Sequence, residues 1–255
     1  MKAYKPHAAS DQSQALSIQR IAQLSSFAKR VTCRLARSPV EREAIFKLRY
    51  QTDLRAGLIS QNPFERYIEP ADHAANAYLM GLYIDRRLVS SLRLQVGSST
   101  TPNFSSVELF PDVLEPLLRS NKTVVDMSCV AADAELARQY VWLPYLILRS
   151  WIMTAEHFQA DYIAAAVRPP HQLFYQRALN CELHCELRQP SHHVASVGLV
   201  TLNFATSVKR LYEKFPFLRS APSERQQLFE HDTRPSRSPA RSLRDRRTTR
   251  LRAKE

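Results

Sequence analysis

Three polar side chains stand within runs of otherwise apolar residues, where burying a charge is costly. The segment from Thr123 to Ala131 is predicted to be a strand, and Asp126 and Ser128 share one of its faces. A second predicted strand, Leu88 to Val96, carries Arg93 on its polar face. A buried carboxylate and a buried guanidinium either form an ion pair with each other or take part in chemistry such as proton transfer. The pattern is compatible with both.

The elements that must position these residues alternate between strands and helices. Predicted strands cover 31–37, 77–84, 88–96, 123–131, 161–167, 181–189 and 194–204. Predicted helices cover 12–29, 38–56, 140–158 and 169–179, with a long loop over 60–76 and a short helix or loop over 107–118. Ser38-Pro39-Val40-Glu41 is typical of a capped helix start, and Gly57 of a helix end. The order predicts an α/β (α+β) fold.

The composition excludes several classes of protein. The 255 residues are 44% hydrophobic, which is enough for one large core. Four glycines exclude collagen-like repeats and a glycine-dense phosphate loop. The sequence contains no run of about 18 apolar residues, so no transmembrane helix is predicted. The N-terminus lacks the apolar region of a secretory signal. We therefore expect a cytoplasmic protein whose four cysteines are thiols.

The net charge of +12 is concentrated at the C-terminus. Residues 234–255 hold nine basic and two acidic residues, or +7, which leaves +5 for the rest of the chain. We expect an N-terminal helical segment over 1–30, one folded domain over 31–215, and a disordered basic tail over 219–255. The tail lacks interleaved aromatic residues, so it could make weak contact with nucleic acid or a membrane surface only through charge.

Three segments together resemble the GNAT acyltransferases. They are AIFKLRYQTDLRAG (44–57), RRLVSSLRLQV (86–96) and DYIAAAVRPPHQLFYQRALNCE (161–182). In their order and spacing they are most similar to the N-acyl amino acid synthases, a GNAT-like family related to acyl-homoserine-lactone autoinducer synthases. The resemblance implies a central twisted mixed sheet of about six or seven strands, with the helix from Tyr140 against one face. It also implies a gap between the strands that start near Thr123 and Asp161.

The resemblance implies amide formation from a thioester. An amino acid or similar small amine would attack the thioester carbonyl of a long-chain acyl group. Backbone N–H groups from Asp126 to Val130 would bind the pantetheine and the developing oxyanion. Ser128, Cys129 and Val130 are therefore expected to bind substrate. Lactone-forming autoinducer synthesis is the alternative within the same fold, and binding through the basic tail is the alternative outside enzymology.

The expected acyl donor is a carrier protein rather than coenzyme A. The segment AADAELARQYVW (131–142) contains no glycine where GNAT enzymes carry their pyrophosphate loop. The acyl-phosphopantetheine of an acyl carrier protein would then be the donor, with no cofactor bound and no metal site. Carrier proteins are acidic, so basic residues on this chain could dock them. The candidates are Arg86, Arg87, Arg138 and Arg168, and the alternative is that these four side chains are simply solvated.

Each residue that the resemblance selects has a structural alternative. Asp126 would orient or deprotonate the amine, or pair with Arg93; both roles are compatible with the family pattern. Asp72, in EPADHAANAY, corresponds to an acidic loop position of the autoinducer synthases, or is solvated. Arg49 corresponds to an early family arginine, or lies on a solvated helix face. Tyr175 corresponds to the tyrosine that protonates the leaving thiolate in many GNAT enzymes, or packs in the core.

The cysteines and adjacent histidines are expected to be structural. Four residues along a strand separate Cys181 and Cys185 by roughly 13 Å, too far for a disulfide, so both are expected to be buried thiols. Cys129 is expected to face away from Asp126 and to pack. The pair His192-His193 is expected to be solvated, because no further ligand sits at metal spacing.

Overall fold

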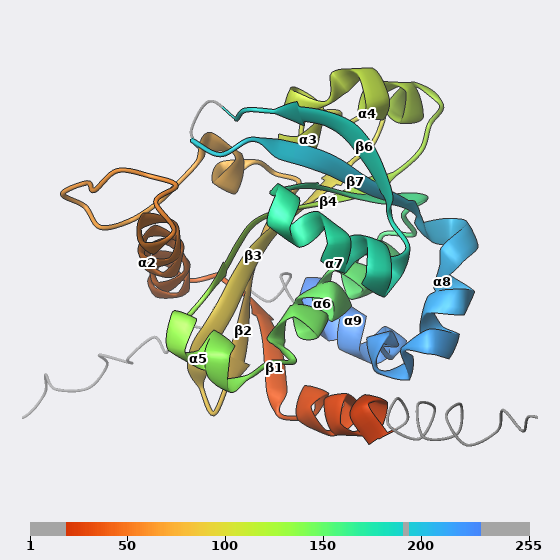
Figure 1. The fold of residues 1–255 in the computed structure, drawn as a ribbon. Helices are drawn as coiled ribbons and strands as arrows, with labels where there is room; N and C mark the ends of the chain where they lie inside the picture. Colours follow the sequence, from red (N-terminus) through yellow and green to blue (C-terminus); the bar gives the residue numbers. More distant parts are fainter. Residues whose placement is uncertain (1–18, 191–193, 231–255) are drawn as a thin grey trace, which may run out of the picture.

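The chain forms one sheet of seven strands in the order β1-β2-β3-β4-β5-β7-β6 (Figure 1). The computed structural model describes residues 19–190 and 194–230, apart from the side chains of residues 185 and 186. The strands are β1 (Val31–Leu35), β2 (Ala77–Ile84), β3 (Arg87–Gly97), β4 (Val124–Ala132), β5 (Tyr162–Val167), β6 (Glu182–Arg188) and β7 (Val197–Asn203). The helices are α2 (Pro39–Arg55), η1 (Pro70–His73), α3 (Ser105–Leu109), α4 (Pro111–Arg119), α5 (Ala134–Gln139), α6 (Leu143–His157), α7 (Pro169–Leu179), α8 (Phe204–Lys214), η2 (Pro216–Leu218) and α9 (Pro222–Phe229).

β4 and β5 separate soon after they meet. Every other neighbouring pair in the sheet is antiparallel, whereas β4 and β5 are parallel and pair over three positions, the last being Asp126 opposite Ala164. β4 continues to Ala132 without β5 beside it. The predicted gap is confirmed, and it leaves backbone groups of β4 without strand partners on that side.

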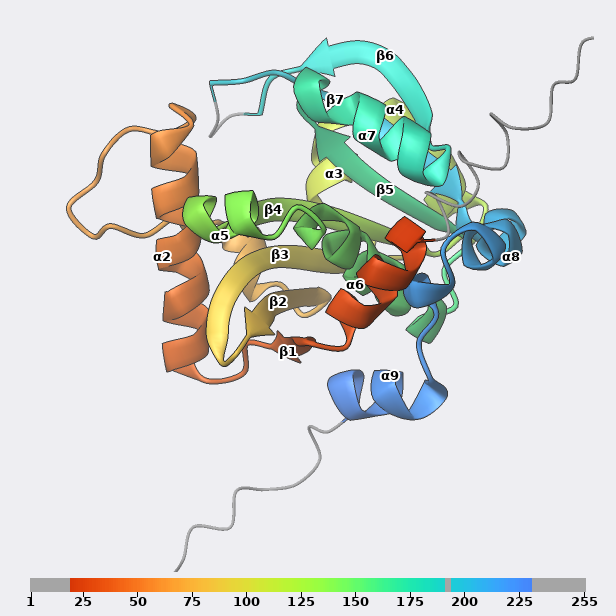
Figure 2. The same cartoon turned by 60° about the horizontal axis from the view of Figure 1, so that its bottom comes forward.

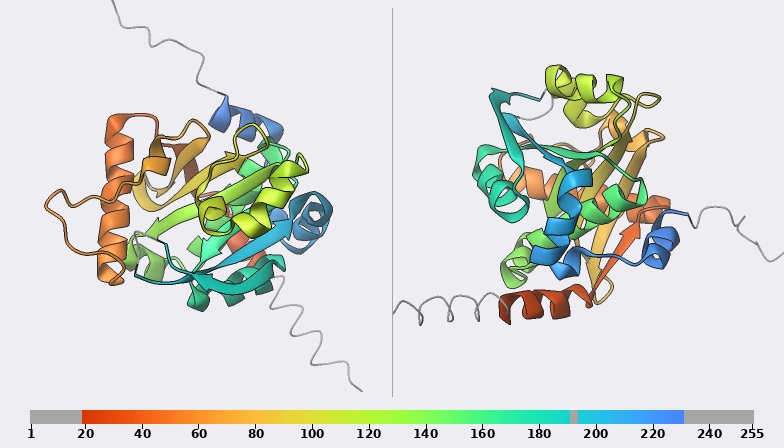
Figure 3. Two further views of the ribbon diagram at one scale, coloured as in Figure 1. Left: turned by 90° about the horizontal axis from the view of Figure 1, so that it is seen from above. Right: turned by 90° about the vertical axis from the view of Figure 1, so that its right-hand side faces the viewer.

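The two faces of the sheet bear different helices. α6 and α7 cover one face, which Figure 2 turns toward the viewer, and the Trp151 indole N–H donates to the Val125 carbonyl at 2.9 Å. α3 and α4 cover the other face, in front of the strands in the left view of Figure 3, and pack through Phe104 and Phe110. α2 packs beside them through Ile45 and Phe46. The face under α2 and α3 carries Arg93 and Asp126.

α2 begins with the capping box that the sequence predicts. The Glu41 N–H donates to Ser38 Oγ at 3.2 Å, and the Ser38 N–H donates back to Glu41 Oε2 at 3.1 Å. Pro39 occupies the first turn, where its missing N–H removes no helical bond. Gly57 follows the helix with a φ of 67°, a conformation that glycine adopts without steric cost.

Replacing Ser38 with alanine should lower the free energy of unfolding by about 1 kcal/mol, because the Glu41 N–H loses its acceptor, Ser38 Oγ. Urea denaturation of the variant and the wild type measures the difference. The exposed Ser120, at the end of α4, provides the matched serine-to-alanine control. An unchanged midpoint for Ser38→Ala would contradict the capping role.

The helices at the chain ends differ from the expectations. The predicted disordered tail from residue 219 is wrong for its first part, because α9 packs onto α6. Arg149 pairs with Glu224 at 2.8 Å, and the Phe229 ring stacks on His157. Residues 19–28 are helical and bury Leu24 and Phe27 in the core, as the packed-helix interpretation predicts. Residues 1–18 and 231–255, with most of the basic tail, lie outside the described residues.

Two further elements were not expected from the pattern. The helix predicted over 140–158 begins at Leu143 with Pro144 in its first turn, and a separate α5 precedes it. α8 follows β7, where no element was predicted. Among the residues that the structure describes, no helix has the length and apolar character needed to span a membrane.

Candidate active site

Arg93 lies at the centre of a buried polar network on the face under α2 and α3. Its side chain is 1% exposed, and each of its three nitrogens donates a hydrogen bond. Nη2 contacts Glu69 Oε2 at 2.6 Å, Nη1 contacts Asp72 Oδ1 at 3.0 Å, and Nε contacts Ser128 Oγ at 3.1 Å. Nη2 also donates to Ser105 Oγ at 2.7 Å, which ties the network to the start of α3.

Asp72 joins Arg93 to α2. Its Oδ1 accepts from Arg49 Nη1 at 2.8 Å as well as from Arg93, and its Oδ2 accepts from the Glu69 N–H at 2.8 Å. Pro70 starts the 3₁₀ turn η1, so the loop after residue 60 folds back over the sheet with both carboxylates facing inward. Asp72 and Arg49 are 2% and 1% exposed, so the alternative that they are solvated is wrong.

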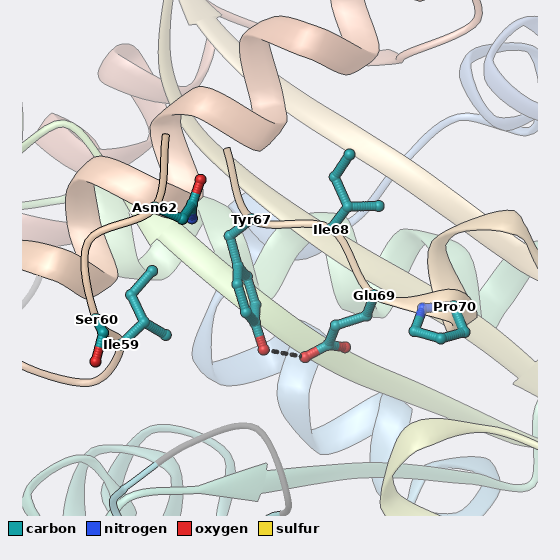
Figure 4. A pocket seen from close by; sticks show the side chains of 7 residues that line it. All are labelled: Ile59, Ser60, Asn62, Tyr67, Ile68, Glu69 and Pro70. Carbon is teal, nitrogen blue, oxygen red and sulfur yellow. Dashed lines mark hydrogen bonds between the residues drawn. The ribbon is translucent and has the colours of Figure 1, made fainter. Parts of the chain in front are cut away.

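Glu69 connects the buried network to a pocket of about 260 Å³. The lining residues are Ile59, Ser60, Asn62, Tyr67, Ile68, Glu69 and Pro70. In Figure 4, Tyr67 and Glu69 point toward each other from one segment of the loop, and the Tyr67 hydroxyl donates to Glu69 Oε1. Burial alone would raise the pKa of Glu69, but Arg93 and the Tyr67 hydroxyl outweigh it and bring that pKa down to about 2. Glu69 is therefore an anion at the pocket wall.

Cys129 joins the same network, contrary to the expectation that it faces away. β4 bulges opposite Leu92, and Cys129 adopts a φ of 49°, which breaks the regular alternation of side chains. Its Sγ lies 3.5 Å from Glu69 Oε2. Burial raises the pKa of the Cys129 thiol to about 12, although the Arg49 and Arg93 cations act against it. The thiol is protonated at neutral pH, so it donates rather than acts as a nucleophile.

Asp126 is not the partner of Arg93, so the alternative that the two form an ion pair is wrong. The carboxyl is fully buried, and neither of its oxygens has a hydrogen-bond partner among the described residues. Burial raises the pKa of Asp126 to about 7, although the nearby Ser106 and the Arg93 cation partly oppose this. Asp126 occupies the last paired position before β4 and β5 separate. An unpaired carboxyl that titrates near neutral pH has the properties of a general base.

Tyr175 lies apart from these residues. It belongs to the core on the opposite face of the sheet, where its ring meets Trp151 edge-on at 6.1 Å. Burial raises the pKa of its hydroxyl. This position favours the packing interpretation over protonation of the leaving group. Cys181 is a buried free thiol, whereas the Cys185 side chain and His192-His193 lie outside the described part of the chain.

The four arginines proposed for docking are spread over several elements. Arg86 lies in the β2–β3 turn with a φ of 66°, and Arg138 is exposed on α5. Arg87 pairs with Asp133 at 3.2 Å, so part of its charge is neutralised. Arg168 precedes α7, and its Nη2 lies 3.2 Å from His171 Nε2.

A family model named N-acyl amino acid synthase FeeM matches residues 44–203. The chain belongs to this family. The match spans the buried network, the separated strands and most of the sheet, so the chain is an acyltransferase of the N-acyl amino acid synthase family. No curated protein sequence matches the chain.

Two solved structures share the fold of this chain. FeeM, an N-acyl amino acid synthase from uncultured soil microbes, is 16% identical with a TM-score of 0.58, covering 71% of this chain and 94% of that one. TofI, solved with an inhibitor and MTA, is 14% identical with a TM-score of 0.54, covering 76% and 99%. The expected GNAT-like fold, a mixed sheet flanked by helices, is confirmed.

Sequence reasoning selected several members of the buried network but missed Glu69, Tyr67, Ser105 and Gln95. Glu69 had a signal, because it lies three residues before Asp72 in the same loop. Gln95 shares a strand face with Arg93, and its Oε1 accepts from the Ser105 hydroxyl at 2.8 Å. Tyr67 and Ser105 come from irregular segments, whose side-chain directions no periodicity predicts.

Proposed function

We propose that this acyltransferase moves a long-chain acyl group from the thioester of an acyl carrier protein to the amine of an amino acid, forming an N-acyl amino acid. The separation of β4 from β5 directly after Asp126 carries the proposal. It puts unpaired backbone donors, a carboxyl that titrates near neutral pH and the buried network within one stretch of β4. Family membership supplies the reaction class.

The proposed reaction forms one C–N bond and breaks one C–S bond. The free amine nitrogen attacks the thioester carbonyl, and β4 N–H groups between Met127 and Val130 stabilise the oxyanion. Asp126 accepts the proton that the nitrogen loses, and the C–S electron pair leaves on the pantetheine sulfur, which then takes up a proton. Both Asp126 oxygens are buried, so the proton reaches Asp126 through water or through the hydroxyl of Ser106.

The remaining residues position the reactants. Arg93 fixes Glu69, Asp72 and Ser128 in one arrangement, and the network keeps Glu69 ionised at the pocket wall. An ionised carboxylate at that wall attracts the acceptor's ammonium group before it loses its proton.

Helix α5 supports a carrier protein over coenzyme A as the donor. It occupies the segment where GNAT enzymes carry the pyrophosphate loop, and two of its first three N–H groups are already used. Asp133 Oδ1 accepts from the Glu135 and Leu136 N–H groups, each at 3.0 Å. A carboxylate at this helix start repels a pyrophosphate from the position that would otherwise bind it.

Palmitoyl carrier protein should therefore have a kcat/KM at least tenfold above that of palmitoyl-coenzyme A, and that advantage should shrink as salt rises, because rim charges govern association. Replacing Arg86 and Arg138 with glutamine should lower kcat/KM for the carrier protein alone. Arg119→Gln on the exposed face of α4 is the control. Equal kcat/KM for both donors, with no effect of salt, would refute the carrier proposal.

A further inference from the structure

Arg49 is a buried cation with most of its hydrogen-bonding capacity unused. Nη1 donates to Asp72, whereas Nε and Nη2 are buried and have no partner among the described residues. These two nitrogens carry three N–H bonds, and two of them, one from each nitrogen, point the same way along one edge of the guanidinium. Arg93, buried to the same degree, uses all three of its nitrogens. A buried cationic donor without an acceptor costs free energy, because it has lost its hydrogen bonds to water. A ligand that accepts from these donors recovers that free energy as binding energy.

The charge balance of the network defines which ligand fits. Two guanidinium groups, Arg49 and Arg93, face two carboxylates, Asp72 and Glu69. A lone anion on Arg49 would leave the buried cluster negative, and a lone cation on Glu69 would leave it positive. A zwitterion adds one charge of each sign and keeps the cluster neutral. An α-amino acid is a zwitterion with its two charges a few ångströms apart.

The loop that lines the pocket lies along α2, the helix that carries Arg49. The Tyr67 N–H donates to the Phe46 carbonyl, which lays the pocket loop along α2, and Phe46 shares a helix face with Arg49, three residues on. Glu69 lines the pocket and also contacts Cys129, and the Arg49 cation acts on the Cys129 thiol. Glu69 therefore lines the pocket and is linked to Arg49 through Arg93 and Asp72, and its side chain is 19% exposed.

We propose that the free edge of the Arg49 guanidinium binds the carboxylate of the acceptor while Glu69 binds its ammonium group. This deepens the proposed function, on which it rests, because it assigns the two charges of the amino acid acceptor to Arg49 and Glu69. Amino acid amides and simple amines lack the carboxylate that satisfies Arg49. Because the free nitrogens of Arg49 are buried, side chains around Arg49 must move to admit the carboxylate.

Ligand binding without an acyl donor tests this inference separately from acyl transfer. Twenty L-amino acids and their carboxamides are added to the full chain, and the melting temperature is recorded. At ten times its Kd, a bound amino acid should raise the melting temperature by about 3 °C, and its amide should not. In transfer assays with palmitoyl carrier protein, kcat/KM for the amide should fall by about 10–150-fold, the range for a charged hydrogen bond.

Arg49→Lys keeps the positive charge beside Asp72 but removes the paired N–H donors of the guanidinium. It should abolish the preference for amino acid over amide, whereas Arg55→Lys, exposed on the same helix, should keep it. If Arg49→Lys fails to fold, the comparison of amino acids with their carboxamides on the wild-type chain still tests the inference. Equal melting shifts for acids and amides, no shift with any amino acid, or a folded Arg49→Lys with full preference would each overturn the inference. Preferential binding of amino acids without acyl transfer would refute the proposed function alone.

Discussion

Replacing Arg93 with alanine should lower the free energy of unfolding by about 3–5 kcal/mol, the largest stability effect expected from a single substitution in the network. The guanidinium neutralises Glu69 and Asp72 and is itself 1% exposed. Without it, Asp72 keeps Arg49 as its partner, whereas the Glu69 carboxylate loses its guanidinium partner in a mostly buried position. Urea denaturation measures the loss.

The matched control for Arg93→Ala is Arg119→Ala. Arg119 pairs with Glu115 at 2.8 Å on α4, but its side chain is 68% exposed, and a pair of this kind contributes at most about 1 kcal/mol. Similar losses for the two variants would show that the buried network holds no more free energy than a surface ion pair. Retention of a cooperative transition in Arg93→Ala would show that the fold itself survives.

Replacing Asp126 with asparagine should leave the fold intact and lower the rate of acyl transfer by about 10²–10⁴-fold, the range for loss of a general base. Asparagine has nearly the same shape but accepts no proton. Single-turnover transfer from palmitoyl carrier protein measures the rate, and Glu115→Gln on α4 controls for loss of a surface carboxylate. Full activity in a folded Asp126→Asn would leave catalysis to positioning and to the backbone donors of β4.

The pH dependence gives Asp126 a second signature. Its pKa of about 7 in the folded chain lies above the value of about 3.9 for an unfolded aspartate. The folded state therefore holds the proton more tightly, and the stability that Asp126 contributes is present below about pH 4 and lost as pH rises toward about 7. Asp126→Asn should remove this loss. The wild-type transfer rate should rise with pH to a plateau above about pH 7, because the base must be ionised.

The sequence by itself determined the elements and their kind. The capping box at Ser38 and the glycine at 57 define α2, because both act through bonds between near neighbours. Alternation along β3 and β4 placed Arg93 and Asp126 on one face of the sheet, since the strand period is two. The order of these elements was enough to indicate the family, which the match over residues 44–203 confirms.

The tertiary structure decided which residues meet. Alternation gives the face on which Arg93 lies but not the loop that covers it, and the turn at Pro70 brought Glu69 and Asp72 there in place of Asp126. A bulge moved Cys129 across the sheet, because one extra residue shifts every side chain after it. Such contacts depend on long-range packing of irregular segments, which carry no period for the sequence to reveal.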